Sequence, residues 1–170
     1  MLLREFDGKR PRLGQGVFVA DDVSIIGDVE VGDDVSLWFG VVLRGDVHFI
    51  RIGARANIQD NCVLHVTGGA HPTIVGEEVT VGHAAIVHGC TVERGALIGM
   101  GSHVLDGAVV GERALVAAGA VVSEGFVVPP RTLVAGVPAK VKRPLTDAEL
   151  ERMEMSWQHY VELKDRYLRK

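Results

Sequence analysis

Aromatic residues are scarce in this chain, at 5% of 170 positions, although hydrophobic residues make up 47%. A core with so few rings has to be built from aliphatic side chains and alanine. An excess of basic charge is lacking too, because the formal net charge is -4. This balance offers no basic patch for nucleic acid or anionic lipid. We therefore expect neither nucleic acid nor a membrane as a partner.

Long apolar runs and spaced cysteine pairs are also missing. No run reaches the ~18 apolar residues that a membrane-spanning helix requires. The opening residues, MLLREFDGKR, carry charges where a signal peptide has its apolar centre. These features predict a cytoplasmic protein. Cys62 and Cys90 stand alone, without the spacing of a metal or redox motif, and are expected to be small buried residues.

Glycine, in contrast, is abundant, with 21 residues and no Gly-X-Y period. So many glycines are typical of a fold with many tight corners and exclude collagen. The length suits one domain, residues 1–170, with a sizeable core.

Aliphatic residues recur every six positions along most of the chain. The first series is Val17, Val23, Val29, Val35, Val41 and Val47. The second, two places later, is Val19, Ile25, Val31, Leu37, Leu43 and Phe49. After Phe49 the register slips, and the period resumes at Ile52, Ile58 and Leu64, then from Val92 to Val134. A parallel series holds only small residues: Ala96, Ser102, Ala108, Ala114 and Ala120.

A period of six is a multiple of two and a poor match to 3.6, so it predicts short strands rather than helices. Glycine or a small polar residue follows each apolar pair, as at a corner. Three six-residue faces make a prism-shaped coil of about 18 residues, and residues 11–140 predict roughly seven coils. A β-sandwich, with its turns every ~8–12 residues, does not have this strict period.

The solenoid pattern stops after Pro138, and a helix is predicted over residues 146–168. Thr146 and Glu149 form a capping-box pattern at its start. An apolar stripe at helical spacing follows it: Leu150, Met153, Trp157, Val161 and Leu168. Two roles remain open for this helix, a plain cap or a contribution to the active site.

Three histidines interrupt the repeat in a suggestive arrangement. His65 and His88 each follow an inward residue, so they occupy the same outward slot, one coil apart if Thr67–Thr73 bulges out. Arg44 occupies that slot one coil earlier, whereas His83 faces a different direction. Two chains related by a threefold axis could surround one ion with three imidazoles, which with water make an open catalytic zinc site. Spacing alone leaves the alternative open that these are chance surface histidines.

Several further segments stand out beside these histidines: Leu43-Arg44-Gly45-Asp46, Asn57-Ile58-Gln59-Asp60-Asn61, Leu64-His65-Val66, Val81-Gly82-His83, Val87-His88-Gly89-Cys90 and the Gly99-Met100-Gly101 turn. Together they resemble the gamma-class carbonic anhydrases over nearly the whole chain. The resemblance implies left-handed coils and a homotrimer whose metal, zinc with iron or cobalt as alternatives, is bound by His65, His83 and His88. It implies that metal-bound hydroxide converts carbon dioxide to bicarbonate.

The same resemblance implies roles for four further residues. Gln59 would hydrogen-bond the metal-bound water, and Tyr160 would lie near the site. Arg44 and Asp46 would form an ion pair at the subunit interface, for which a purely structural role is favoured.

The chain departs from the family pattern at its proton-shuttle residues. Val47 follows Asp46 where family members carry a glutamate, and the loop from Val66 to Pro72 has no carboxylate. His71 in that loop could replace them, although a solvated loop histidine is the simpler interpretation. Two alternatives to carbon dioxide hydration therefore remain. One is a metal-dependent acyl-coenzyme A thioesterase or acyltransferase-like protein, and the other is a metal-stabilised trimer without turnover.

Overall fold

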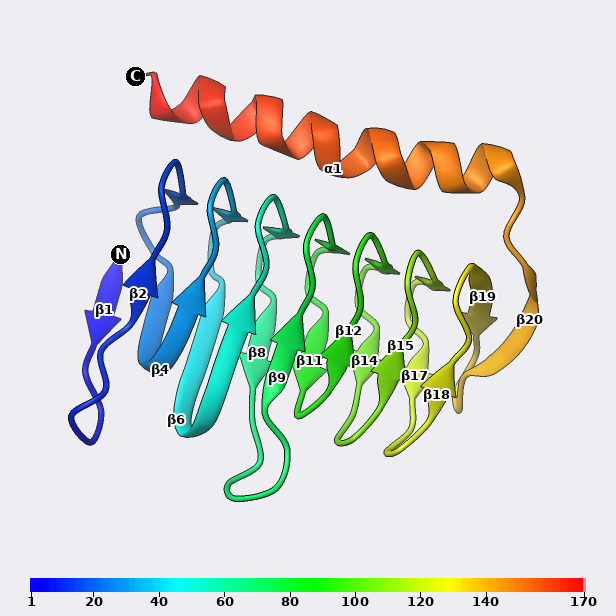
Figure 1. The fold of residues 1–170 in the computed structure, drawn as a ribbon, viewed down its shortest axis with the longest axis horizontal. Helices are drawn as coiled ribbons and strands as arrows, with labels where there is room; N and C mark the ends of the chain where they lie inside the picture. The colour runs from blue at the N-terminus through cyan, green and yellow to red at the C-terminus, as the bar shows by residue number, and fades with distance from the viewer. Residues whose placement is uncertain (170) are drawn as a thin grey trace.

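The computed structural model describes residues 1–169 and shows a parallel β-solenoid of about seven turns with one C-terminal helix (Figure 1). Each turn adds one short strand to each of three faces, and neighbouring turns pair in parallel. The predicted left-handed parallel β-helix is confirmed.

The strands fall into three stacks. The first face holds β1 (Leu2–Arg4), the start of β4 (Ser24–Val31), the start of β6 (Val42–Ile52), β8 (Val63–His65), β11 (Ile86–His88), β14 (His103–Val104) and β17 (Val121–Val122). The second face holds β2 (Arg12–Leu13), the ends of β4 and β6, β9 (Thr73–Val75), β12 (Thr91–Val92), β15 (Val109–Val110) and β18 (Val127–Val128). The third face holds β3 (Phe18–Val19), β5 (Ser36–Leu37), β7 (Asn57–Ile58), β10 (Thr80–Val81), β13 (Leu97–Ile98), β16 (Leu115–Val116), β19 (Thr132–Ala135) and the antiparallel β20 (Lys140–Pro144).

The core is the inside of the prism, where aliphatic residues in the strands and just before them stack on their equivalents in the next coil. Val23, Val35, Ile58, Val81 and Val116 are all fully buried there. The small-residue series from Ala96 to Ala120 is buried as well, as are both cysteines. Aliphatic stacking of this kind needs no aromatic rings, which agrees with the composition.

The first part of the six-residue series ends earlier than predicted. Gly27 pairs with Gly45, but Val29 pairs with Ile50, so residues 46–49 form an insertion that leaves the coil. Val47 is therefore 53% exposed, and Phe49 is only half-buried. The prediction that both belong to the core is wrong, because Ile50 takes the inward slot after the insertion.

Helix α1 (Asp147–Leu168) begins at the predicted capping box, with Thr146 and Glu149 bonded reciprocally. It runs along the third face back towards the N-terminal coils (Figure 1). Leu150 and Met153 pack against the outward leucines of that face, Leu97, Leu115 and Leu133.

The end of the helix differs from the predicted apolar stripe. Leu168 is 49% exposed, so the prediction for it is wrong. Lys164 is 2% exposed instead, with its ammonium 2.9 Å from Asp34 and 2.6 Å from Asp165. Partnership with two carboxylates allows the long side chain to be buried where the helix reaches the first coils.

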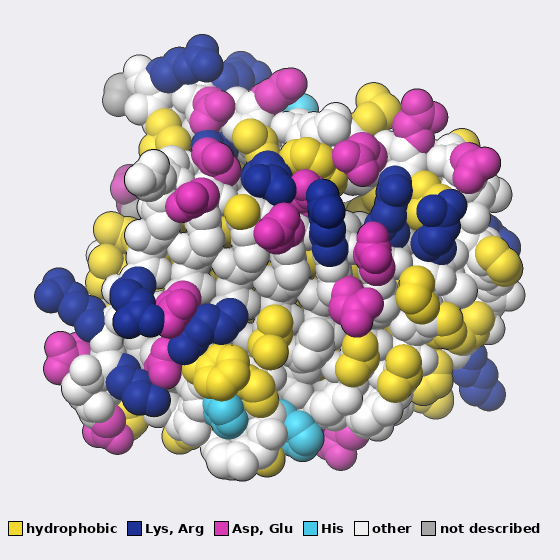
Figure 2. Space-filling view, in the orientation of Figure 1, with side chains coloured by type: hydrophobic (Ala, Val, Ile, Leu, Met, Phe, Trp, Pro, Cys, Tyr) yellow, Lys and Arg dark blue, Asp and Glu magenta, His cyan; other side chains and the backbone are white. Residues whose placement is uncertain are grey.

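The surface carries both signs of charge side by side. Figure 2 shows lysine and arginine side chains interspersed with aspartate and glutamate over the face in view. One such group of opposite charges consists of Arg55 and Arg94, which both pair with Glu78. No helix within residues 1–169 has the length and apolar character to cross a bilayer.

The register shift predicts different costs for the same substitution at two valines. Val116→Ala removes fully buried methyl groups and should lower the free energy of unfolding by about 2 kcal/mol. Val47→Ala should change it by less than about 0.5 kcal/mol, because the side chain is exposed. Denaturant unfolding of both variants measures this, and an equal loss would place Val47 back in the core.

Candidate metal centre

Parallel pairing of β8 and β11 sets His65 directly opposite His88. The Nδ1 atom of His65 lies 3.0 Å from the Nε2 atom of His88. The loop between β8 and β9 leaves the coil as a narrow hairpin, in which Thr67 and His71 pair antiparallel (Figure 1). The predicted shared slot and the predicted bulge are thus both present.

Each of these imidazoles makes its other contact with a carboxylate. Asp46 Oδ1 lies 3.2 Å from His65 Nε2, and Asp106 Oδ1 lies 2.6 Å from His88 Nδ1. A carboxylate accepts hydrogen bonds, so these contacts assign the ring proton of each neutral histidine to the nitrogen that faces its aspartate. The two nitrogens that face each other then both carry lone pairs. Such a pair suits a cation that binds neutral imidazole, and carboxylates behind the ligands are the usual support of a metal site.

The surroundings of the pair favour a neutral His65 and ionised aspartates. Burial lowers the pKa of His65, and the nearby charge of Arg44 lowers it further. Although burial opposes it, hydrogen bonds from Arg44 and His65 lower the pKa of Asp46. Thr67 and His88 likewise lower the pKa of Asp106 against the effect of burial. The neutral form of His65, which a metal ion would need, is therefore favoured by its surroundings.

Arg44 lies beside the histidine pair, in the slot that the sequence predicted. It follows Leu43, which pairs with Leu64 just before His65. Its guanidinium lies 2.5 Å from Asp46 Oδ2, so the two side chains pair within one chain. Their place at a subunit interface stays a prediction. The Arg44 side chain is 44% exposed, which leaves its outer surface open to a further contact.

His83 lies at a different corner, in the turn after β10. Its Nδ1 atom is 2.9 Å from Asp60 Oδ2, and its side chain is 45% exposed. Within residues 1–169, no three side chains of the histidine, cysteine, aspartate or glutamate type lie close enough together to hold a metal ion. One chain thus brings together two of the three predicted ligands and leaves His83 apart from them.

Gln59 and Tyr160 belong to the His83 side of the molecule. Gln59 is 5% exposed, and its amide donates to Asn57 Oδ1 at 3.0 Å. Tyr160, on α1, packs edge-on against Trp38 with ring centroids 5.5 Å apart. Burial and the charge of Asp60, the partner of His83, raise the pKa of Tyr160. The predicted catalytic residues therefore form two groups in one chain, one around His65 and one around His83.

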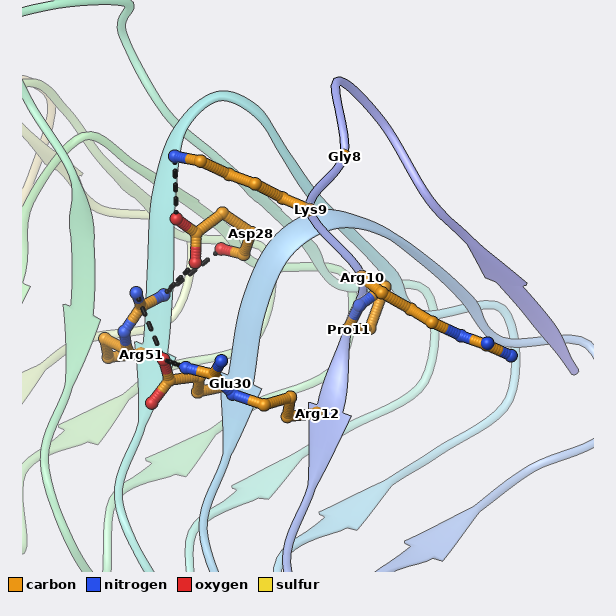
Figure 3. Close-up of a pocket in the computed structure, with 8 residues that line it drawn as sticks. All are labelled: Gly8, Lys9, Arg10, Pro11, Arg12, Asp28, Glu30 and Arg51. Atoms are coloured by element: carbon orange, nitrogen blue, oxygen red, sulfur yellow. Dashed lines mark hydrogen bonds and ion pairs between the residues drawn. The ribbon is translucent and has the colours of Figure 1, made fainter.

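A groove of about 320 Å³ begins at the His83 group and runs between α1 and the corner turns. A larger hollow, of about 480 Å³, lies far along the solenoid at the N-terminal hairpin and contains none of the predicted site residues. In Figure 3, Arg51 lies between Asp28 and Glu30, and Lys9 reaches Asp28. This ion-pair network fastens the hairpin to the first coils, and we assign it a structural role.

Asp106 was missed by the sequence analysis, and Asp46 was predicted only as the partner of Arg44, not as the carboxylate behind His65. Asp106 follows His88 by 18 residues, and Asp46 precedes His65 by 19, so each supporting aspartate comes from a neighbouring coil. A carboxylate about one coil length before or after a candidate histidine was therefore the sequence signal that could have identified this support. Gly89 makes room for this support, because a Cβ there would lie 2.2 Å from Asp106 Oδ1. Its φ of +56° also favours glycine.

His71 differs from the solvated loop histidine that was favoured at the sequence level. It is half-buried, because the hairpin folds back and sets its ring against Gly107 and its Cβ near Gly89. Its charge also contributes to the lowered pKa of Asp106. His71 thus lies behind His88 and Asp106.

Known proteins resemble this chain in both sequence and structure. The family described as bacterial transferase hexapeptide (six repeats) matches residues 10–45 and 89–124. A putative acetyltransferase from Bacillus cereus is 46% identical, with a TM-score of 0.95 over 98% of this chain and 96% of that chain. A hexapeptide transferase family protein from Anaplasma phagocytophilum is 40% identical, with a TM-score of 0.94 over 98% of both chains.

Curated relatives extend over almost the full chain. Protein YrdA of Escherichia coli is 48% identical over 98% of this chain and 94% of its own length. A carbonic anhydrase from Geobacillus kaustophilus is 50% identical over 95% of this chain and 88% of its own length. Gamma carbonic anhydrase 2 of Arabidopsis thaliana mitochondria is 46% identical over 95% of this chain, which spans only 60% of the plant protein. The fold, the six-residue repeat and the identity to these relatives together show that the chain belongs to the gamma carbonic anhydrase family of hexapeptide-repeat proteins.

Proposed function

We propose that this protein is a zinc-dependent carbonic anhydrase, which hydrates carbon dioxide reversibly to bicarbonate at a site between the subunits of a homotrimer. The observation that carries the proposal is the His65–His88 pair, with its lone pairs facing each other and a carboxylate behind each ring. The relatives named carbonic anhydrase, at 46–50% identity, support this activity over other uses of such a pair.

The donor set fits zinc better than a hard cation. Neutral imidazole suits zinc, and also iron or cobalt, whereas magnesium and calcium prefer oxygen ligands. When bound, zinc would lower the pKa of a water ligand to about 7 and so supply hydroxide at neutral pH. Asp46 and Asp106 hold the His65 and His88 rings in the orientation and tautomer that this binding needs.

A second chain is required because His83 faces away from the other two ligands. In a trimer, His65 and His88 of one subunit would meet His83 of the partner subunit. The first face supports such an interface, since the outward positions just before its inward residues carry a half-buried and largely apolar row: Val42, Val63, Ile86, His103 and Val121. Arg44 extends the same surface, and its Asp46 pair would keep the subunits in register.

Gln59 and Tyr160 would reach the shared site together with His83. Gln59 already donates to Asn57, which in turn donates to Thr80 at 2.9 Å, so its amide orientation is set. The side-chain oxygen Oε1 of Gln59 can then accept a hydrogen bond from water at the site. Tyr160, held against Trp38, would border the substrate without adding charge.

This chain lacks the glutamates that transfer protons in other family members. The proton released in each turnover therefore has to leave by another route. Val47 replaces one of these glutamates. It is exposed on the insertion at residues 46–49 and lies next to Gly68 of the hairpin between β8 and β9. His71 lies behind Asp106 rather than on the side of the facing nitrogens. We therefore propose that proton transfer to buffer limits the rate.

Hydrolysis of an acyl-coenzyme A thioester is the second candidate, and acyltransferase-like activity is related to it. The putative acetyltransferase from Bacillus cereus is 46% identical to this chain, and the groove beside His83 is larger than carbon dioxide needs. A metal-stabilised trimer without turnover is the third candidate.

Loss of the His83 imidazole should remove the metal without unfolding the coil. His83→Ala should lower zinc content per subunit at least tenfold while leaving the circular dichroism spectrum unchanged, because the side chain is half-exposed and outside the core. His159→Ala, on the exposed side of α1, is the matched control and should retain full zinc. Full occupancy in His83→Ala would remove His83 from the ligand set.

One preparation can distinguish the two enzymatic candidates. Zinc-loaded trimer should hydrate carbon dioxide in stopped-flow measurements and cleave acetyl-coenzyme A at least a hundredfold less efficiently. His83→Ala should abolish the hydration. Efficient thioester cleavage without hydration would replace the first candidate with the second, and neither activity at full zinc occupancy would favour the third.

The missing glutamates predict a dependence on buffer. The hydration rate should rise with the concentration of a small imidazole buffer until another step becomes limiting, because the proton is passed to the buffer directly. Gly69→Glu places a carboxylate in the exposed hairpin and should weaken that dependence. Rapid hydration by the parent protein with no buffer effect would contradict the prediction and direct attention to His71.

A further inference from the structure

Thr73 places a hydroxyl group in a column of the core that is otherwise apolar around it. It pairs with Ile50 in the preceding coil, and Cys90 and Ala108 occupy the same position in the next two coils. Thr73 is fully buried. A buried hydroxyl destabilises a fold unless it is hydrogen-bonded, and the aliphatic stack does not need one. Thr73 is therefore a polar residue that the repeat itself does not require.

The Thr73 hydroxyl joins the backbones of the two coils that carry His65 and His88. It donates to the carbonyl oxygen of His65 at 2.5 Å. It also accepts from the amide of Gly89, the residue after His88, at 2.9 Å. The same amide lies 3.1 Å from the His65 carbonyl oxygen. One buried side chain thus ties together the two backbone segments from which the imidazoles project.

A second threonine hydroxyl, at the start of the hairpin between β8 and β9, acts on the same pair. Thr67 donates to Asp106 Oδ2 at 2.6 Å, while Oδ1 of that carboxylate lies 2.6 Å from His88 Nδ1. Because both oxygens are engaged, the carboxylate cannot turn without losing a hydrogen bond. Backbone hydrogen bonds of 2.9 and 3.0 Å between Thr67 and His71 keep the hairpin closed. The hairpin therefore holds Asp106 in place behind His88.

We propose that Thr67 and Thr73 are positioning residues, which set the His65–His88 pair for metal binding before a metal arrives. Thr73 fixes the spacing of the two backbones, and Thr67, through Asp106, fixes the tautomer of His88. Groups behind metal ligands typically contribute about 10- to 100-fold to metal affinity. The inference rests on the proposed function in one respect, because it takes His65 and His88 as ligands.

Thr67→Val removes one hydroxyl and keeps the branched shape of the side chain. Asp106 should then turn, so the neutral His88 ring should no longer carry its proton on Nδ1 alone. Long-range ¹H–¹⁵N NMR spectra of metal-free protein labelled with ¹⁵N at histidine measure this tautomer. The zinc dissociation constant, measured against a competing chelator, should rise about tenfold. Thr67→Ser retains the hydroxyl and should restore both the tautomer and the affinity.

Thr73→Val distinguishes a positioning role from a purely structural one. Because Ile50 and Cys90 fill the equivalent positions, a purely structural Thr73 would tolerate valine without any effect on zinc. We expect an unchanged circular dichroism spectrum with about tenfold weaker zinc binding, and parent affinity in Thr73→Ser. Thr73→Cys, whose thiol is a weak hydrogen-bonding group, should behave as the valine variant and replaces it if that variant does not fold.

Thr132→Val is the matched control, because it also removes a hydroxyl that donates to a carbonyl oxygen, that of Pro129 in the last coil. It should bind zinc as the parent does. Parent affinity in both valine variants would overturn the proposal. An equal loss in the serine and valine variants would overturn it too, because the hydroxyl would not be the cause.

The tautomer measurement separates this inference from the proposed function. If the parent protein binds no zinc, the proposed function fails, and the spectra of the metal-free protein still decide the role of Thr67. A His88 ring that keeps its proton on Nδ1 in Thr67→Val would remove Thr67 from the proposal, even in a protein that binds zinc and hydrates carbon dioxide.

Discussion

Parallel pairing between neighbouring coils is the constraint on which the candidate site depends. Because each strand of the first face pairs with its equivalent one coil later, residues in the same slot come directly opposite each other. His65 and His88 are 23 positions apart in the sequence, yet their ring nitrogens lie 3.0 Å apart. The buried aliphatic stack holds this register, since a slip by one residue would turn its apolar residues outwards. The same stack therefore fixes the positions of His65 and His88 relative to each other.

The insertions in two consecutive coils complete the arrangement around that pair. The first, at residues 46–49, is where Asp46 meets His65 and where Val47 leaves the core. The second insertion is the hairpin from Val66 to Pro72. Its Thr67 hydroxyl donates a hydrogen bond of 2.6 Å to Asp106, the carboxylate behind His88. Both breaks in the repeat therefore lie beside the histidine pair and supply or support a carboxylate. The regular coils position the two histidines, and the insertions add the groups that hydrogen-bond around them.

The repeat and the helix cap could be predicted from sequence because both depend on local patterns. Alternation of aliphatic and small residues is sufficient for the coils, and Thr146 with Glu149 is sufficient for the start of α1. The predictions for Val47 and Phe49 were wrong because a periodic series does not reveal where an insertion begins. Burial of Lys164 was missed because it depends on Asp34, from a distant coil. For the site, the shared slot of His65 and His88 was predictable, whereas Asp60 and Asp106 required the pairing between coils to be known.

A mixed trimer tests most directly the central claim that two chains share each metal. His83→Ala lacks one ligand, and the double variant His65→Ala, His88→Ala lacks the other two, so neither should bind zinc in a pure trimer. If the ligands come from neighbouring subunits, unfolding and refolding the two variants together should form trimers that each contain one intact site. The measurement is the zinc content of the refolded mixture, and the account predicts that it rises well above that of either variant alone. Zinc content that stays at the level of the separate variants, in trimers shown to contain both chains, would contradict a shared site.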